Sequence, residues 1–433
     1  MGRVHVCLLV LIAGCGRFGF TDSSSRPDAD DGIARITVER GGTMGGTIMG
    51  TDLFQCSASS CTLEVPRGTA VWLRAVPTAD AWFAGWSGPC GGNFTCELAA
   101  TGDVTVGAEF APLPNRVFVT STTTNGSFGG LAAGDAICTA RANAAGLSGT
   151  FIAYLSSSTT DAASRLAASR GWVRVDGAPV ADAPTAFSNG SIVFPPRLNE
   201  YGDDVGTLSV YTGTSLGAKT ANRCLDWTSA LATDNATLTR AHYAANMVNG
   251  STGNCGQSAA LLCVEIGRNV PVAIHPDPQA QLAFTSRTLW TPGNGRSSAD
   301  AVCAADAVNA GLAGTFLAGL ATTTESIESR FPPGRIYRRG DGVRLLRTAG
   351  IFSTDSLDVP PELDARGSHV TTDYWTGTLR WASPAQATQN CSDWSISSTV
   401  ITGDLLYAPN PDLRNATKTT ACNTALPVLC FEN

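Results

Sequence analysis

Lysine is almost missing from this chain, and histidine, methionine and charged residues in general are scarce. The 433 residues include four His and four Met, and 15% are charged, against about 25% in a typical protein. Lys219 and Lys418 are the only lysines. With a net charge of −7, the chain lacks the basic character of nucleic-acid-binding proteins, so we expect no nucleic-acid partner.

Motifs for catalysis are also missing. The sequence has no H-E-x-x-H zinc motif and no phosphate-binding loop. After the first 14 residues the histidines are His242, His275 and His369, and they form no evident triad with a serine. We therefore predict no catalytic residues and no cofactor, and we expect that the protein is not an enzyme.

The amino terminus has the pattern of an export signal. Arg3 precedes an apolar run over 6–12, and Ile-Ala-Gly then leads to Cys15. A charged start, an apolar run of about 7–15 residues and small residues before a cut site are typical of secretory signal peptides. The run is shorter than the roughly 20 residues of a membrane span. The sequence thus predicts a signal peptide over 1–14.

The ending of this signal resembles that of bacterial lipoproteins, in which the cysteine is lipidated and becomes the mature amino terminus. We predict lipidation of Cys15, followed by a flexible Ser- and Asp-rich tether, so that 15–33 holds the body off the membrane. Gly16, in place of Asp, favours sorting to the outer membrane or cell surface. An ordinary signal peptide with an incidental cysteine is the alternative.

Cysteines are abundant, with fourteen in the chain. Cys7 would leave with the signal and Cys15 would carry the lipid, so twelve remain. An even number in an exported chain favours six disulfides. Zinc binding is the alternative role for these cysteines. A zinc site needs closely paired cysteines or additional histidine ligands, and no histidine lies beside a cysteine in the sequence. We predict no metal site.

Eight of these cysteines reveal an internal repeat. The spacings within the two sets are 86, 31 and 8 positions in the first and 88, 31 and 8 in the second. Thr-Gly-Thr, Cys-x-Asp-Trp and Leu-Cys-x-Glu recur around them in the same order. This pattern indicates two copies of one module of about 150 residues. The spacing leaves three pairings open in each module. The two sets are Cys138, Cys224, Cys255 and Cys263, and Cys303, Cys391, Cys422 and Cys430.

Together, these motifs resemble the endostatin domain of collagens, and more closely a family of bacterial lipoproteins of unknown function built on the same module. That fold is similar to C-type lectins. The resemblance covers 115–266 and 282–433, with a linker over 267–281. It implies nested disulfides, first cysteine to last and second to third. The implied pairs are Cys138–Cys263, Cys224–Cys255, Cys303–Cys430 and Cys391–Cys422.

The segment 34–112 alternates apolar and polar residues, as strands do. Cys56 and Cys61 are five positions apart, and Cys90 and Cys96 are six apart, so we expect each pair to close a hairpin-like loop. Phe-Ala-Gly-Trp86-Ser-Gly-Pro-Cys resembles the divergent internalin B-repeat of bacterial surface proteins. That resemblance implies a small β-grasp-like domain that serves as a stalk or adhesive module, with Trp86 in its core. The predicted fold class is therefore α+β.

Local patterns in the first module predict a helix over 130–145 that ends at Gly146. We expect Asp135 in its first turn, where a carboxylate suits the helix dipole. Ile137, Ala140 and Ala144 are expected to form its apolar face. The loop-rich segment that follows, up to Thr212, corresponds to the region where lectin-like folds place ligand-facing loops.

Recurring carboxylates are the remaining candidates for chemistry. Asp226 and Asp393 each precede a tryptophan. They either act in catalysis or ligand binding or, as we favour, bind backbone amides near a disulfide. Glu265 and Glu432 also recur and are expected to be structural. The acidic run 199–204 could hold calcium through oxygen ligands, but an ordinary surface turn is the favoured interpretation. The second module has no close sequence equivalent of it.

Arginines crowd one stretch of the second module. Guanidinium groups suit sulfate, phosphate and carboxylate ligands, so we predict an anion-binding patch there. A solvated strand pair in a chain that prefers Arg to Lys is the alternative. The candidate residues are Arg330, Arg335, Arg338, Arg339, Arg344 and Arg347.

The predicted function is that of an exported surface lipoprotein that binds an anionic glycan, a matrix component or another surface protein. Its membrane contact would be the lipid alone. The alternatives are a structural envelope lipoprotein without a soluble ligand and, third, a carbohydrate-active hydrolase.

Overall fold

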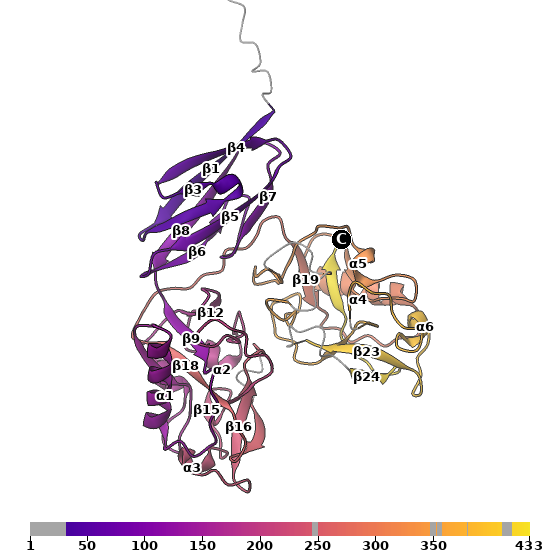
Figure 1. Ribbon diagram of the computed structural model, residues 1–433. Coiled ribbons are helices and arrows are strands. Elements are labelled where there is room, and N and C mark those ends of the chain that lie inside the picture. The colour runs from indigo at the N-terminus through magenta and orange to yellow at the C-terminus, as the bar shows by residue number, and fades with distance from the viewer. Residues whose placement is uncertain (1–31, 245–249, 347–351, 353–356, 379, 409–417) are drawn as a thin grey trace, which may run out of the picture.

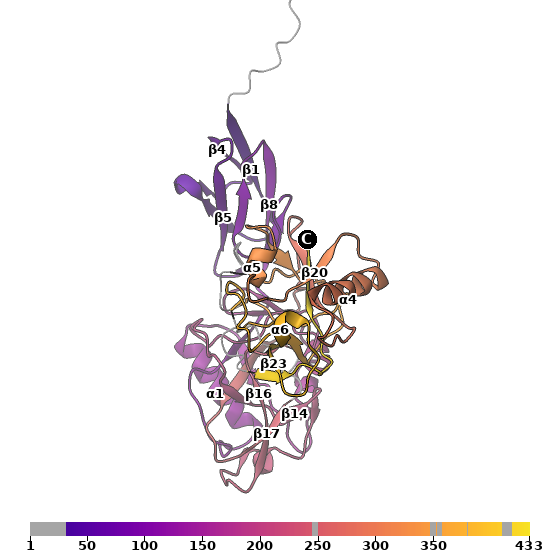
Figure 2. The same cartoon turned by 90° about the vertical axis from the view of Figure 1, so that its right-hand side faces the viewer.

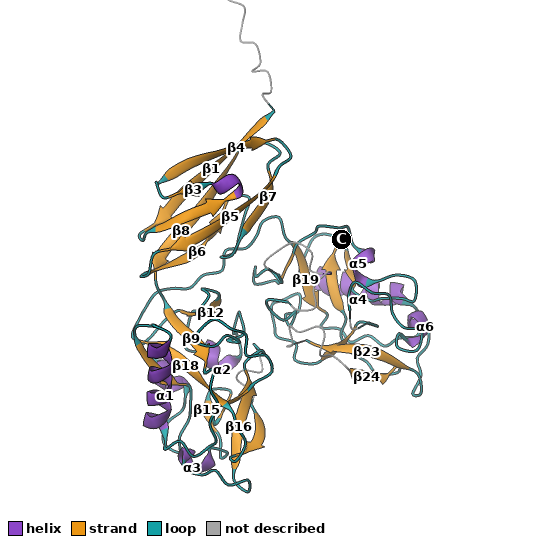
Figure 3. Cartoon of the chain, in the orientation of Figure 1, coloured by secondary structure: helices purple, strands orange, loops and turns teal. Residues whose placement is uncertain are grey.

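The computed structural model describes residues 32–244, 250–346, 352, 357–378, 380–408 and 418–433 (Figure 1). The predicted signal peptide, Cys15 and nearly all of the tether lie outside these residues. Three bodies follow one another along the chain, which we name the N-terminal domain (32–112), module 1 (115–266) and module 2 (282–433). Strands dominate each of them, and helices occur in both modules, so the class is α+β as predicted (Figure 3).

The N-terminal domain is made of two four-stranded sheets, β4-β1-β8-β6 and β3-β2-β5-β7. Apolar residues of both sheets share one core, which includes Trp86 as predicted. The only helical segment in 32–112 is a short 3-10 helix, η1. The domain is thus a sandwich of two sheets, which differs from the expected β-grasp-like arrangement of a sheet around a helix. Its elements are β1 (Ile33–Gly42), β2 (Gly46–Gly50), η1 (Thr51–Leu53), β3 (Gln55–Cys56), β4 (Ser60–Pro66), β5 (Ala70–Pro77), β6 (Ala81–Ser87), β7 (Cys96–Ala99) and β8 (Val104–Pro112).

Module 1 is built on one mixed sheet in the order β12-β11-β9-β18-β13-β16-β17, with β10 also paired to β18. The helix α1 packs on this sheet through a core that it shares with β10 and β18. Its elements are β9 (Asn115–Val119), α1 (Leu131–Ala144), β10 (Thr150–Ala153), η2 (Ala163–Leu166), β11 (Trp172–Arg174), β12 (Pro179–Ala181), α2 (Ala186–Asn189), β13 (Ser209–Tyr211), β14 (Thr214–Ser215), β15 (Ala218–Lys219), α3 (Cys224–Trp227), β16 (Asn235–Arg240), β17 (Ser251–Asn254) and β18 (Ala260–Ile266).

Module 2 follows the same order in its described residues, without counterparts of β12, α2, β14 and β15. Its strands form two sheets, β20-β25-β19-β21 and β22-β23-β24. A single parallel bridge between Trp375 and Val428 connects the two sheets. Its elements are β19 (Gln281–Thr285), α4 (Arg296–Asn309), β20 (Phe316–Ala318), α5 (Ile327–Arg330), β21 (Tyr337–Arg338), β22 (Asp373–Trp375), α6 (Cys391–Trp394), β23 (Thr402–Tyr407), β24 (Lys418–Ala421) and β25 (Leu429–Glu432). Among the described residues, no helix is long and apolar enough to cross a bilayer.

Six disulfides join all twelve cysteines of the described domains. Two close short loops in the N-terminal domain, Cys56–Cys61 and Cys90–Cys96. Each module has the nested pair that the resemblance implies. The outer bridge joins the long helix to the last strand. The inner bridge joins two cysteines that are 31 positions apart and that lie between the outer cysteines in the sequence. The module pairs are Cys138–Cys263, Cys224–Cys255, Cys303–Cys430 and Cys391–Cys422.

The buried face of α1 differs from the predicted one. Gly134, Cys138 and Ala142 face the core, four residues apart, whereas Ala140 and Ala144 are exposed and Ile137 is half-buried. The reason is that the disulfide of Cys138 fixes which side of the helix meets the sheet. The helix does end as predicted, before Gly146, which has a positive φ of 69°.

The three bodies meet around the linker 267–281 (Figures 1 and 2). Trp82 of the N-terminal domain donates its indole N–H to the Gly177 carbonyl of module 1 at 2.9 Å. Phe94 packs edge-on against Phe194, with ring centroids 5.7 Å apart. Module 2 joins through Arg339, which donates to a carbonyl of module 1. The linker is therefore part of a packed junction.

Candidate functional site

Both modules use the same internal ion pair to hold the long helix. In module 1, Asp135 accepts a hydrogen bond from the Ala153 amide at 2.9 Å and pairs with Arg165 at 2.6 Å. In module 2, Asp300 pairs with Arg330 in the same way, also at 2.6 Å. Asp135 thus links α1 to β10 and η2, and it does not lie in the first turn of the helix, where we expected it. Arg330, one of the predicted anion ligands, has this structural use.

Two further arginines of the predicted patch are buried. Arg339 is 1% exposed and binds Asp341 at 2.6 Å and the Pro360 carbonyl at 3.1 Å. Arg344 lies with its Nε 3.4 Å from Asp277 of the linker. Burial lowers the pKa of Arg344, while nearby carboxylates, Asp277 first, act in the opposite direction.

The structure therefore does not gather the predicted arginines on one exposed surface. Arg335 donates to the Glu432 carbonyl at 3.3 Å, and Arg347 lies outside the described residues. The physical reason is that carboxylates and carbonyls distant in sequence fold back onto this stretch. Arg338 is the exception, because it lines an open groove.

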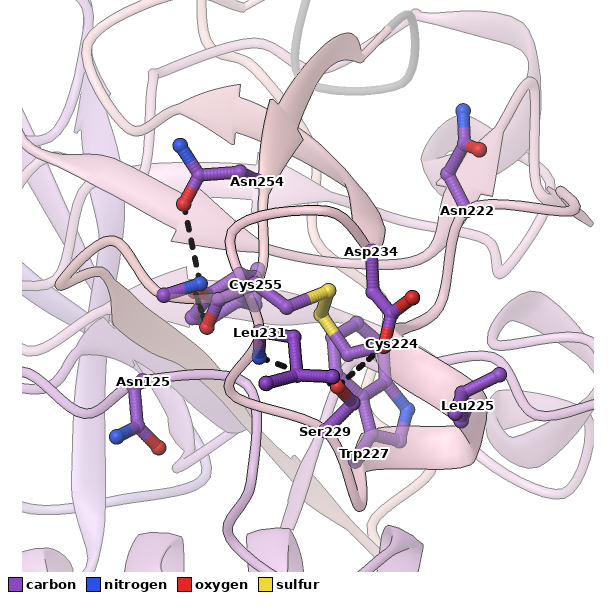
Figure 4. Close-up of a disulfide and its surroundings, with 12 residues drawn as sticks. Asn125, Asn222, Cys224, Leu225, Trp227, Ser229, Leu231, Asp234, Asn254 and Cys255 are labelled. Carbon is purple, nitrogen blue, oxygen red and sulfur yellow. Dashed lines mark hydrogen bonds between the residues drawn. A yellow bond between two sulfur atoms is a disulfide. The ribbon is translucent and has the colours of Figure 1, made fainter.

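The two Cys-x-Asp-Trp motifs form a strained turn in each module. All four residues of α3 have positive φ, between 50° and 67°, and those of α6 repeat this. Such a left-handed turn costs about 1–2 kcal/mol per residue. Figure 4 shows how Trp227 and the Cys224–Cys255 disulfide pack together beside this turn. The buried indole donates its N–H to the Ser156 carbonyl at 2.9 Å, which helps to hold the turn in place.

The carboxylates of these turns serve the structure. Asp226 accepts hydrogen bonds from the amide and hydroxyl of Ser158, and Asp393 accepts the same two bonds from Thr323. Burial would raise the pKa of Asp226, but the bonds from Ser158 and Arg223 outweigh it, so the pKa is lowered. The backbone-binding interpretation that we favoured from the sequence agrees with these contacts.

Two of the three carboxylates in the acidic turn of module 1 pair with arginines, and the third, Asp203, accepts a hydrogen bond from the Asn199 side-chain amide at 3.3 Å. Glu200 pairs with Arg141 of α1, and Asp204 pairs with Arg197. Burial would raise the pKa of Glu200, yet hydrogen bonds, those from Ser121 foremost, lower it below its ordinary value. Asn199 organises the turn through its side-chain oxygen, which accepts the amides of residues 201 and 203.

Module 2 does have an equivalent of this turn, contrary to the expectation from sequence. Asp364 takes the place of Asn199 and accepts the amides of Arg366 and Ser368, both at 2.9 Å. The sequence did not indicate this equivalence, because the two turns share only one feature, an Asn or Asp whose side-chain oxygen accepts two backbone amides. Across 364–368 no acidic residue other than Asp364 remains.

A groove on module 2 borders this second turn. It has a volume of about 630 Å³ and continues into a smaller hollow of about 190 Å³. Leu282 and Phe284 of β19 and Leu312 after α4 supply apolar walls. Three arginines lie along the two hollows, and we name the whole the arginine groove. Its arginines are Arg287, Arg338 and Arg366.

The arginines of the groove differ in their exposure and in their contacts with the protein. Arg287 has a side chain that is 66% exposed and lies 3.6 Å from Asp364. Arg366 is exposed and donates once to the Asn309 carbonyl at 3.0 Å. The Nε of Arg338 is buried and has no hydrogen-bond partner among the described residues. A buried donor of this kind costs about 1–3 kcal/mol unless a partner arrives.

The carboxylates near the groove are already occupied. Asp306 accepts the amides of Arg287 and Thr288 and the hydroxyl of Thr288. Asp364 is buried with its two backbone bonds, and Asp341 pairs with the buried Arg339. The three carboxylates beside the arginine groove therefore already have hydrogen-bond or ion-pair partners within the protein.

Module 1 fills the corresponding place with its own side chains. Leu282 and Arg116 are equivalent, because their amides donate to Glu432 and Glu265, respectively. Arg116 is buried, pairs with Glu265 at 2.8 Å and lies over the Phe151 ring. The two modules therefore share a scaffold but differ at this surface.

Asp404 of β23 is a further unusual group, and it yields a stability prediction. It is 3% exposed, and burial raises its pKa to about 6. The ordinary pKa of an aspartate is about 3.9. The folded protein therefore keeps its full stability below pH 4, where this carboxyl is protonated, and loses part of it as the pH rises through 6 and the buried group becomes charged. The Asp404→Asn variant should be more stable than the parent by up to about 3 kcal/mol at pH 8 and nearly unchanged at pH 4. Urea unfolding at the two pH values measures this, and an equal gain at both would contradict it.

No known protein family matches the chain, and no curated protein is similar to it. In the part of the chain that the structure describes, no three His, Cys, Asp or Glu side chains are grouped closely enough to hold a metal. Sequence reasoning missed Arg287 and Arg366, which lie far from the arginine-rich stretch. The signal for Arg366 is its replacement of Tyr201 in the repeat, but only the structure identifies these two positions as equivalent.

Proposed function

We propose that this is an exported, lipid-anchored bacterial surface protein that binds an anionic glycan through module 2. The observation that carries the proposal is the arginine groove, whose nearby carboxylates are occupied and whose guanidinium groups line an open channel. Arginine forks bind carboxylate and sulfate in pairs of charge-assisted hydrogen bonds. A long, open groove suits a chain-like ligand.

Export and anchoring rest on the sequence and on the bridges. Six disulfides favour an oxidising compartment. The nested bridges, with the long helix tied to the last strand, support the proposed endostatin-like and C-type-lectin-like fold of both modules. The N-terminal domain would hold them away from the membrane.

The test measures binding of heparin, as an acidic glycan, to the mature chain. We expect saturable binding, which Arg338→Ala together with Arg366→Ala weakens by roughly 10–100-fold, the equivalent of one or two charge-assisted bonds. The matched control is Arg240→Ala, an exposed arginine of module 1. Equal losses in the control and the groove variant would indicate a diffuse charge effect and remove the groove from the proposal.

A further inference from the structure

One tryptophan of this protein is exposed to solvent. The chain has nine, and eight of them are at most 5% exposed. Trp72 of the N-terminal domain is 44% exposed. Because indole is a large and mostly apolar ring, leaving it in water forgoes burial that the other eight achieve. The exposed ring therefore leaves a large apolar surface open to solvent on this domain.

The strand β5 explains how Trp72 reaches the surface. Its side chains alternate between the faces of the sheet, so Val71 and Leu73 enter the core while Trp72 and Arg74 face outward. On the neighbouring β7, Glu97 lies directly opposite Trp72 in the register. The indole thus rests on a sheet, with a cationic and an anionic side chain close by.

This face of the sheet forms one wall of an open cleft of about 810 Å³. The opposite wall comes from Gln279 of the linker and from Gly334 and Ile336 of module 2. The walls are held in position, because Gln279 donates its side-chain amide to the Pro89 carbonyl at 2.6 Å. The Ile336 carbonyl accepts the amide of Gln281 at 2.8 Å.

We infer that the Trp72 cleft, defined by Trp72, Arg74, Glu97, Gln279 and Ile336, binds a neutral sugar. A pyranose ring has an apolar C–H face that packs on an indole, and its rim of hydroxyls both donates and accepts hydrogen bonds. Glu97 accepts and Arg74 donates at the edge of the platform. Since these two charges oppose one another, the cleft offers an acidic ligand little, in contrast to the arginine groove.

A cleft with two walls also suits a slender chain better than the flat surface of a folded protein. The cleft involves no residue of the arginine groove, so this inference stands apart from the proposed function. If both hold, the protein would contact one polysaccharide, or two different ones, at separate places on its surface.

Titration of the mature chain with neutral oligosaccharides tests the inference. The probes are soluble oligomers of glucose, mannose, xylose and N-acetylglucosamine. We expect at least one to bind saturably and to change the tryptophan fluorescence. Trp72→Ala should weaken that binding by roughly tenfold or more, and Trp72→Phe by less, because a smaller ring still stacks.

Two controls separate the possible results. The Arg338→Ala and Arg366→Ala double variant should bind the neutral sugar as the parent does, whereas it loses heparin. Trp72→Ala should keep the parent's thermal midpoint and its heparin binding, because the ring is on the surface. Binding of none of the probes, or equal binding by the parent and Trp72→Ala, would overturn the inference. So would a response of Trp72 to a partner protein alone.

Discussion

Replacing Cys303 and Cys430 by alanine should lower the free energy of unfolding of module 2 by about 5 kcal/mol. The bridge joins α4 to β25 across 127 positions, so its loss frees a long loop in the unfolded chain. Both cysteines are fully buried in the core around Trp375 and Trp394. Chemical denaturation in non-reducing buffer measures the change.

The matched control is the short bridge of the N-terminal domain. Cys56 and Cys61 are five positions apart, and removing that bridge should cost about 2 kcal/mol by the same relation. If the two variants lost equal stability in their own domains, closure of the long loop would not be what the outer bridge contributes.

Replacing Arg339 by alanine should destabilise module 2 by about 3–5 kcal/mol. Its guanidinium bonds Asp341 and the carbonyls of Pro360 and Val193. Glu362, which is fully buried, would lose the positive charge that lies 4.0 Å away. A charge left in the interior without that neighbour is costly, because the surrounding protein solvates it poorly.

The adjacent Arg338→Ala variant is the control for this prediction. Arg338 lines the arginine groove, so its removal should change the stability by less than about 1 kcal/mol while it weakens heparin binding. Arg339→Ala should show the opposite balance. Similar losses of stability in the two variants would contradict the assignment of one arginine to the interior and its neighbour to the groove.

The disulfide framework could be predicted from sequence because its signal is covalent and repeated. Two sets of four cysteines at matching spacing defined the modules, and the resemblance supplied the nesting. The end of α1 at Gly146 was likewise predictable, since a local backbone conformation decides it. The buried face of α1 was predicted wrongly, because apolar periodicity alone was used and the bridge from Cys138 to Cys263 selects another side of the helix.

The use of each arginine could not be predicted, because it depends on which carboxylate the fold brings near. Arg330 meets Asp300, thirty positions earlier, and Arg344 meets Asp277 of the linker. Crowding in sequence was therefore a poor guide to a shared surface. For Trp72, alternation along β5 predicts that it shares a face with Arg74, but not that module 2 borders this face.

The most direct test of the proposed function is an array of acidic and neutral glycans probed with the intact mature chain. The account predicts saturable binding to glycans that carry carboxylate or sulfate groups, lost in the Arg338→Ala and Arg366→Ala double variant and kept in Arg240→Ala. Binding to no acidic glycan would contradict it and favour a structural envelope protein, and hydrolysis of a bound glycan would contradict the expectation that the protein is not an enzyme.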